Sequence, residues 1–152
     1  MRQADRKYAR SIRIGATPSA VWAAIVDVET WPTWASQFKR LERLDAGPLA
    51  SGSRVRVTPK GMPGGIWHVT DYEEGRSFTW ASSLGPGVVL TGGHVVTSDG
   101  DGTNAEFWLD ASGILGTLLT PLLRRTLFSR NTRTATEGLK SHVERRGPAS
   151  VP

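Results

Sequence analysis

Cysteine is absent from the 152-residue sequence. A thiol nucleophile, a disulfide framework and a cysteine-based metal site are therefore excluded. The sequence also lacks a long hydrophobic run, because the longest one, residues 114–123, is far shorter than the roughly 20 residues of a membrane-spanning helix. The charged N-terminus has no apolar segment of the kind that a secretory signal contains, so we expect a cytoplasmic protein.

Several signatures of catalysis and cofactor binding are missing as well. There is no Gly-x-Ser-x-Gly motif, and no pair of carboxylates is placed by its spacing on one inward face. The glycine-rich segments 61–65 and 85–92 are not followed by a helix, which argues against a phosphate-binding loop. The three histidines lie on separate predicted elements without the spacing of metal ligands. We therefore expect neither a metal nor a cofactor.

Positive charge is concentrated at the two ends of the chain. The net charge is +4 over residues 1–13, −4 over residues 14–112 and +5 over residues 113–152. A nucleic-acid-binding protein would combine such charge with surface aromatics or a recognisable reading motif, and neither is present. We therefore expect no nucleic-acid partner and interpret the C-terminal arginines as a solvated helix face.

Two short helices are predicted after the first strand. Thr17 can cap a helix and Pro18 suits its first position, so we expect a helix that ends near Asp27. A second helical turn over residues 28–31 should end at Pro32, which also favours extended geometry in the residue before it. The large aromatic rings beside this break are expected either to plug a core or to rim a cavity.

The middle of the chain is rich in predicted strands. Turn residues separate seven such segments, which are 8–14, 38–44, 53–58, 66–72, 76–82, 88–97 and 103–111. Strands joined by short turns are typical of an antiparallel meander. From Gly113 on, apolar residues recur at helical spacing up to Gly147, and Pro121 is expected to kink or restart this helix.

A sheet of this size needs one face covered, and only the C-terminal helix of about 30 residues is long enough to cover it. The sequence therefore predicts an α+β fold: a curved antiparallel sheet of about seven strands wraps around a long C-terminal helix, with two short helices after the first strand. Side chains cannot fill the whole concave side, which predicts an apolar ligand pocket. We expect one domain over residues 8–146 and flexible termini at 1–7 and 147–152.

Several local strings occur together in an order that resembles a known family. They are Ala16-Thr17-Pro18 with Val21-Trp22, Asp27 with Trp31-Pro32-x-Trp34, Gly52-Ser53-x-Val55, Trp67-x-Val69-Thr70 with Arg76-Ser77-Phe78-Thr79-Trp80, His94, and Glu137-Gly138-Leu139-Lys140. The set resembles the START-like or SRPBCC superfamily, which includes polyketide cyclases, aromatases and lipid carriers. The resemblance covers roughly residues 8–146. It implies a helix-grip fold with a deep cavity between the sheet and the C-terminal helix, but no single activity.

Side-chain alternation and the predicted cavity together give a set of candidate site residues. The predicted ligand-binding residues are Trp34, Phe38, Trp67, Phe78, Trp80, His94, Phe107, Leu109, Leu118 and Leu122. Core packing is the alternative explanation for most of these apolar side chains, and the pattern does not decide which way Trp67 faces. Leu118 and Leu122 are included because they share a helical face with residues 128, 132, 135, 139 and 143.

His94 is the strongest candidate for chemistry, because imidazole titrates near neutral pH and His94 lies in an apolar strand. The alternative is a histidine that is only hydrogen-bonded within the sheet. Tyr72 is the second candidate for proton transfer. His68 is expected to face outward, and His142 is expected to be solvated.

Arg54 and Arg56 alternate with valines, and the strand register decides between two arrangements. If the valines face the cavity, both arginines are surface residues. With the opposite register, an arginine would enter the pocket and bind an anionic ligand.

Three functions remain open at this stage. The first is a binding module for a small hydrophobic molecule such as a polyketide, fatty acyl or isoprenoid compound. The second is a polyketide cyclase or dehydratase, in which the cavity orients a flexible chain and His94 or Tyr72 moves protons. The third uses the basic C-terminal helix to dock on a membrane or an acidic partner while a ligand is delivered. The sequence is compatible with a monomer or a homodimer.

Overall fold

The computed structural model describes residues 8–146, with all of their side chains except that of Arg124. The termini that were predicted to be flexible, residues 1–7 and 147–152, lie outside this range. The elements in chain order are β1 (Tyr8–Ile14), α1 (Pro18–Val26), η2 (Val28–Thr33), β2 (Phe38–Arg43), β3 (Arg54–Pro59), β4 (Gly65–Glu73), β5 (Ser77–Gly85), β6 (Val88–Asp99), β7 (Gly102–Ser112), α2 (Ile114–Leu123), η3 (Arg124–Phe128) and α3 (Ser129–Arg146).

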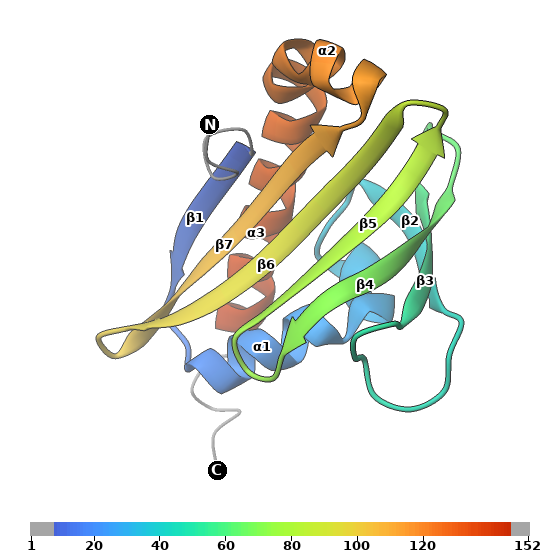
Figure 1. Cartoon of the computed structure of the whole chain (residues 1–152). Helices are drawn as coiled ribbons and strands as arrows, with labels where there is room; N and C mark the ends of the chain where they lie inside the picture. Colours follow the sequence, from blue (N-terminus) through green and yellow to red (C-terminus); the bar gives the residue numbers. More distant parts are fainter. Residues whose placement is uncertain (1–7, 147–152) are drawn as a thin grey trace.

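The seven strands form one antiparallel sheet in the order β1-β7-β6-β5-β4-β3-β2. The sheet curls around α3, while α1 and η2 cross its concave side at one end and α2 lies at the other end (Figure 1). The predicted α+β helix-grip fold is therefore confirmed. No helix within residues 8–146 is long and apolar enough to cross a membrane.

The start of α1 follows the predicted capping pattern. The Thr17 hydroxyl oxygen accepts a hydrogen bond from the backbone N–H of Ala20 at 3.2 Å, and Pro18 occupies the first helical position. Both features satisfy or avoid backbone donors that a helix start leaves unpaired. The cap and the proline therefore fix where α1 begins, after the chain leaves β1 and crosses to the concave side of the sheet.

The expectation that Pro32 ends any helix is wrong. Pro32 lies inside the 3-10 helix η2, and Trp31 before it is helical rather than extended. Trp31 is buried, and its indole Nε1 donates a 2.9 Å hydrogen bond to the carbonyl of Ile25. This tertiary anchor outweighs the local preference of the residue that precedes a proline.

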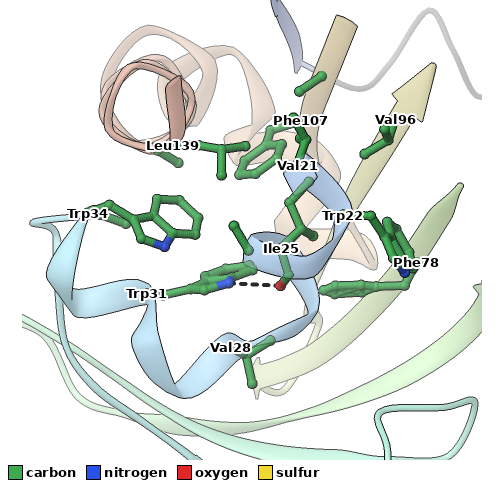
Figure 2. Close-up of a cluster of buried hydrophobic side chains, with 14 of the residues drawn as sticks. Val21, Trp22, Ile25, Val28, Trp31, Trp34, Phe78, Val96, Phe107 and Leu139 are labelled. Carbon is green, nitrogen blue, oxygen red and sulfur yellow. Dashed lines mark hydrogen bonds between the residues drawn. The ribbon is translucent and has the colours of Figure 1, made fainter. Parts of the chain in front are cut away.

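The core fills the end of the sheet that α1 and η2 close. Figure 2 shows Val21, Trp22 and Ile25 of α1 packed together with side chains of the sheet, η2 and α3, and all of the residues it labels are buried. A second buried cluster, formed by Leu90, Ala111 and Phe128, lies apart from this core. The side chain of Trp67 packs against both clusters.

The C-terminal helical region is interrupted, but not where the sequence suggested. Pro121 lies within α2, and the irregularity is the single π turn η3 that follows it. A π turn accommodates about one extra residue, which rotates the preceding helix by roughly 100° relative to the next one. Leu118 and Leu122 therefore leave the face that Thr132 and Leu139 share, and are 72% and 60% exposed.

Candidate functional site

A pocket of about 120 Å³ lies between the concave face of the sheet, η3 and the first turns of α3. Its lining is Trp31, Phe38, Val57, Pro59, Met62, Pro63, Gly65, Trp67, Trp80, Leu84, Leu90, Gly92, Gly93, His94, Phe107, Trp108, Leu109, Leu127, Phe128, Asn131, Thr132 and Ala135. Met62 and Leu84 are exposed as well as lining, so they mark its opening, which we call the mouth. The mouth lies at the end of the sheet opposite α1.

The strand register places the wall of the pocket in cross-strand rows. Gly92 of β6 is paired with Trp80 of β5 on one side and with Leu109 of β7 on the other. A Cβ atom on Gly92 would lie 3.2 Å from the Trp80 indole nitrogen and 3.3 Å from a Leu109 methyl carbon. Because Gly92 has no side chain, the Trp80 indole and the Leu109 side chain can extend over it, and the space on this face of the sheet belongs to the pocket.

The deep end of the pocket is built from aromatic rings. The Trp31 ring centroid lies 5.2 Å from that of Trp80 and 5.2 Å from that of His94, and the Phe107 ring is 4.8 Å from that of His94. The hydrogen bond from Trp31 to Ile25 in Figure 2 fixes the orientation of the tryptophan that faces the other rings. Aromatic walls of this kind offer a large apolar surface of fixed shape to a ligand.

His94 lies among these rings and is buried. Its Nδ1 is 3.2 Å from the carbonyl oxygen of Phe78, and its ring stacks on the Phe78 ring at a centroid distance of 4.2 Å. Burial lowers the pKa of His94 to about 3, and the bond to the Phe78 carbonyl acts in the opposite direction. The imidazole is therefore neutral at physiological pH. Because a carbonyl oxygen can only accept, the hydrogen bond assigns the proton to Nδ1 and leaves Nε2 as an acceptor.

Two polar atoms of the deep end remain available to a ligand. His94 Nε2 and Trp80 Nε1 form no hydrogen bond with another described residue. Both atoms keep some accessible surface, because the fully enclosed polar atoms without a partner do not include them. Both residues line the pocket. The deep end of the pocket therefore presents one acceptor and one N–H donor among its aromatic rings.

None of the lining residues whose side chains the structure describes is charged. The register settles the two arrangements left open for the β3 arginines: the valines of β3 are buried and both arginines face outward. The Arg54 guanidinium pairs with Asp45 at 2.9 Å, and Arg56 pairs with Glu42 at 3.3 Å. The strand thus offers no cation to an anionic ligand in the pocket.

The structure brings together part of the predicted ligand-binding set. The predicted residues that line the pocket are Phe38, Trp67, Trp80, His94, Phe107 and Leu109. Trp67 faces inward, a point that its sequence pattern did not decide. Leu118 and Leu122 do not line the pocket, because the π turn rotates them to the surface.

Three other predicted residues lie outside the lining. Phe78 is fully buried beneath His94, and Trp34 is buried against Trp31 and His142. His142 is therefore partly buried rather than solvated, and burial lowers its pKa. The Tyr72 hydroxyl lies 2.5 Å from a carboxylate oxygen of Glu74, and burial together with this bond raises the pKa of Tyr72 to about 12.

Sequence reasoning missed much of the helical side of the pocket. The lining residues that it did not single out include Trp31, Leu127, Phe128, Thr132 and Ala135. Trp31 was noted only as an aromatic ring beside a chain break. The last three belonged to the predicted inner face of the C-terminal helix, so this face was the available signal for them.

Comparisons with known proteins agree with this geometry. The sequence model of the family described as polyketide cyclase / dehydrase and lipid transport matches residues 5–144. None of the curated protein sequences matches the chain.

Several solved structures share the fold at low sequence identity. The ZhuI aromatase/cyclase from Streptomyces sp. R1128 is 18% identical with a TM-score of 0.73, covering 96% of this chain and 98% of that one. A START superfamily protein from Mycobacterium smegmatis is 18% identical with a TM-score of 0.71, covering 92% of this chain and 98% of the other. The di-domain aromatase/cyclase StfQ of the steffimycin pathway is 17% identical with a TM-score of 0.75, and 98% of this chain aligns with 54% of it. At these identities the likeness shows the fold alone.

Proposed function

Because the chain belongs to the polyketide cyclase / dehydrase and lipid transport family, we propose that its pocket binds a small, uncharged, ring-containing hydrophobic molecule. The observation that carries this proposal is the lining itself, which is rich in aromatic rings, has no charge among its described side chains and includes a neutral imidazole. Burying an unpaired charge in such surroundings is costly. A hydroxyl or carbonyl group placed beside His94 and Trp80 can instead be hydrogen-bonded.

The size of the pocket supports a single ring at its deep end. Its volume of about 120 Å³ is similar to that of an engineered cavity of roughly 150 Å³ that admits benzene. A longer polyketide-, lipid- or isoprenoid-like ligand would place one ring or chain end there. The remainder would extend through the mouth between Met62 and Leu84.

The state of His94 favours binding over proton transfer. A catalytic acid or base works best when its pKa lies near the operating pH, whereas burial holds the pKa of His94 at about 3. Tyr72 is engaged with Glu74 outside the pocket. We therefore assign His94 Nε2 the role of accepting a hydrogen bond from the ligand and thereby orienting it.

A cyclase or dehydratase is the second candidate function. The aromatase/cyclase structures that share this fold favour it, and so does the presence of His94 in the pocket. Such an enzyme would gain its rate mainly by holding a flexible chain so that its reacting carbons meet. Turnover of a polyketide-like substrate that is lost in a His94→Phe variant, with binding retained, would favour this function over the first.

A matched set of three single-ring compounds tests the binding proposal. 4-Propylphenol, propylbenzene and 4-propylbenzoate differ only in carrying a hydroxyl, a hydrogen or a carboxylate opposite the propyl chain. We expect 4-propylphenol to bind most tightly and 4-propylbenzoate not to bind measurably. Quenching of tryptophan fluorescence reports binding directly, because Trp31, Trp67 and Trp80 line the pocket.

A variant pair isolates the hydrogen bond. His94→Phe keeps an aromatic ring but removes the acceptor, and His68→Phe makes the same change on the exposed face of β4 as the control. An unsatisfied buried hydroxyl costs about 1–3 kcal/mol, so the affinity ratio of 4-propylphenol to propylbenzene should fall at least about fivefold in His94→Phe only. Because a change in pocket shape affects both compounds, the ratio of their affinities reports the loss of the hydrogen bond alone. Tightest binding of the benzoate, or no binding of any of the three compounds, would refute the proposal.

A further inference from the structure

Helix α2 presents an apolar face to solvent. Ile114, Leu118 and Leu122 are 81%, 72% and 60% exposed, and their four-residue spacing places them on one side of the helix. Leu115 and Leu119 extend this face and are also exposed. We call these five residues the α2 stripe. Isolated exposed leucines need no explanation, but a contiguous apolar surface of this kind usually marks an interaction site.

The exposure of the stripe is not the result of a detached helix. The backbone N–H groups of Leu115 and Gly116 both donate to the carbonyl of Gly87, at 2.9 and 3.0 Å. Gly116 is buried against Ala111 at the end of β7. The opposite side of α2 is thus fastened to the sheet, and this attachment holds the stripe outward.

The stripe is next to the mouth of the pocket. Gly87, to which α2 is fastened, lies in the β5–β6 turn a few residues after the exposed Leu84 of the mouth. Figure 1 shows α2 at the same end of the sheet as this turn. A binding partner that covers the α2 stripe would therefore also lie over the mouth of the pocket.

The chain segment that contains the stripe carries only positive charge. The sequence contains no acidic residue between Asp110 and Glu137, and four arginines lie in this interval. Arg125, Arg130 and Arg133 are exposed, and none of them forms an ion pair with another described residue. The first of them follows Leu122 by about one helical turn. Apolar side chains flanked by unpaired arginines are the combination that binds anionic lipid surfaces.

We propose that α2 docks this protein on an anionic lipid bilayer. The α2 stripe enters the boundary between headgroups and acyl chains, and the arginines that follow it bind the lipid phosphates. A second copy of the chain is a poorer occupant of the same surface, because a two-fold contact through α2 would bring like-charged arginines together. The docking surface stands on its own residues and does not depend on which molecule occupies the pocket.

Vesicle flotation of the full chain tests the charge requirement. We expect binding to phosphatidylcholine vesicles that contain about 30% phosphatidylglycerol, little binding to pure phosphatidylcholine, and release as salt rises from about 0.1 to about 0.5 M. The double variant Arg125→Glu/Arg130→Glu should bind at least tenfold more weakly. Arg145→Glu/Arg146→Glu makes the same charge change at the far end of α3 and should bind like the wild type.

A second pair of variants tests the stripe. Leu118→Asp/Leu122→Asp should lose at least tenfold in vesicle binding, while Ala23→Asp/Ser141→Asp adds the same charge at exposed helix positions elsewhere and should not. Exposed sites are used throughout, and circular dichroism checks that each variant folds.

A single fluorescent label tests insertion directly. Because the sequence has no cysteine, Leu118→Cys can be labelled uniquely with a polarity-sensitive dye, and Ser141→Cys provides the control. A blue shift on anionic vesicles at position 118 alone is the expected result. The proposal is overturned if the wild type ignores anionic vesicles, or if the stripe variants bind them normally. It is also overturned if the wild type is a dimer that the stripe variants convert to monomers.

Discussion

Acidification should destabilise this protein through His94 in particular. The imidazole is enclosed by the rings of Trp31, Phe78, Trp80 and Phe107, where a charged form would lose its hydration. Its pKa is therefore lowered from 6.5 to about 3 by burial, while the bond to the Phe78 carbonyl acts in the opposite direction. In the unfolded chain the same group titrates at its ordinary value. The two states consequently bind different numbers of protons between these two pH values.

The sign of the effect follows from this difference. Below about pH 6.5 the unfolded state takes up a proton that the folded state refuses, so acid favours unfolding. The contribution of His94 to stability is fully present above pH 6.5 and is lost progressively as the pH falls toward 3. With these two pKa values, the free energy of unfolding should drop by about 2.5 kcal/mol between about pH 7 and about pH 4.5.

Urea denaturation of the wild type and His94→Phe across this pH range measures the contribution. Other groups with shifted pKa values, including His142, Asp45 and Glu144, titrate in both proteins and cancel in the difference. The wild type should lose about 2.5 kcal/mol more than the variant on acidification. Parallel profiles would mean that His94 titrates normally in the folded state, and the assignment of a dry, neutral imidazole would then be refuted.

Three further predictions concern packing. Gly138→Ala should destabilise the protein by about 3 kcal/mol or more in urea denaturation, instead of adding the usual helix-propensity gain of about 1 kcal/mol, because the new Cβ would lie 1.7 Å from the Trp34 carbonyl oxygen. Gly92→Ala should preserve the fold but weaken binding of 4-propylphenol, because its Cβ meets the Trp80 indole at 3.2 Å within the pocket wall. Trp31→Phe should cost about 1–3 kcal/mol, since it deprives a buried carbonyl of α1 of its indole donor.

The sheet could be predicted because its strands repeat with a period of two and are separated by strong turn signals. The first strand has the predicted bounds, and the hairpin between β6 and β7 turns at Gly100 with a positive φ of 64°, within the glycine- and aspartate-rich segment 98–102. Errors at the other strands amount to a few residues at their ends. Short connections favour the pairing of consecutive strands from β3 to β7, but not the pairing of β1 with β7 at the edge of the sheet.

The strand side of the pocket was accessible to sequence reasoning for the same reason. Trp80, Phe107 and Leu109 alternate with outward residues, so their inward direction is set once the sheet is placed. The place of Trp31 in the lining could not be predicted from the sequence, because it requires a proline inside η2 and a hydrogen bond to a residue of the preceding helix. Neither condition can be inferred from local preference, which disfavours helical geometry before proline.

The apolar side chains at the two ends of the C-terminal region face different ways because of one structural irregularity. In an unbroken α-helix, Leu118 would share a face with Thr132, which lines the pocket. The π turn η3 changes the phase between α2 and α3 by roughly a quarter of a turn. Phe128 and Thr132 line the pocket, while Leu118 and Leu122 are exposed to solvent. The π turn thus accounts for the apolar surface that α2 presents near the entrance of the pocket.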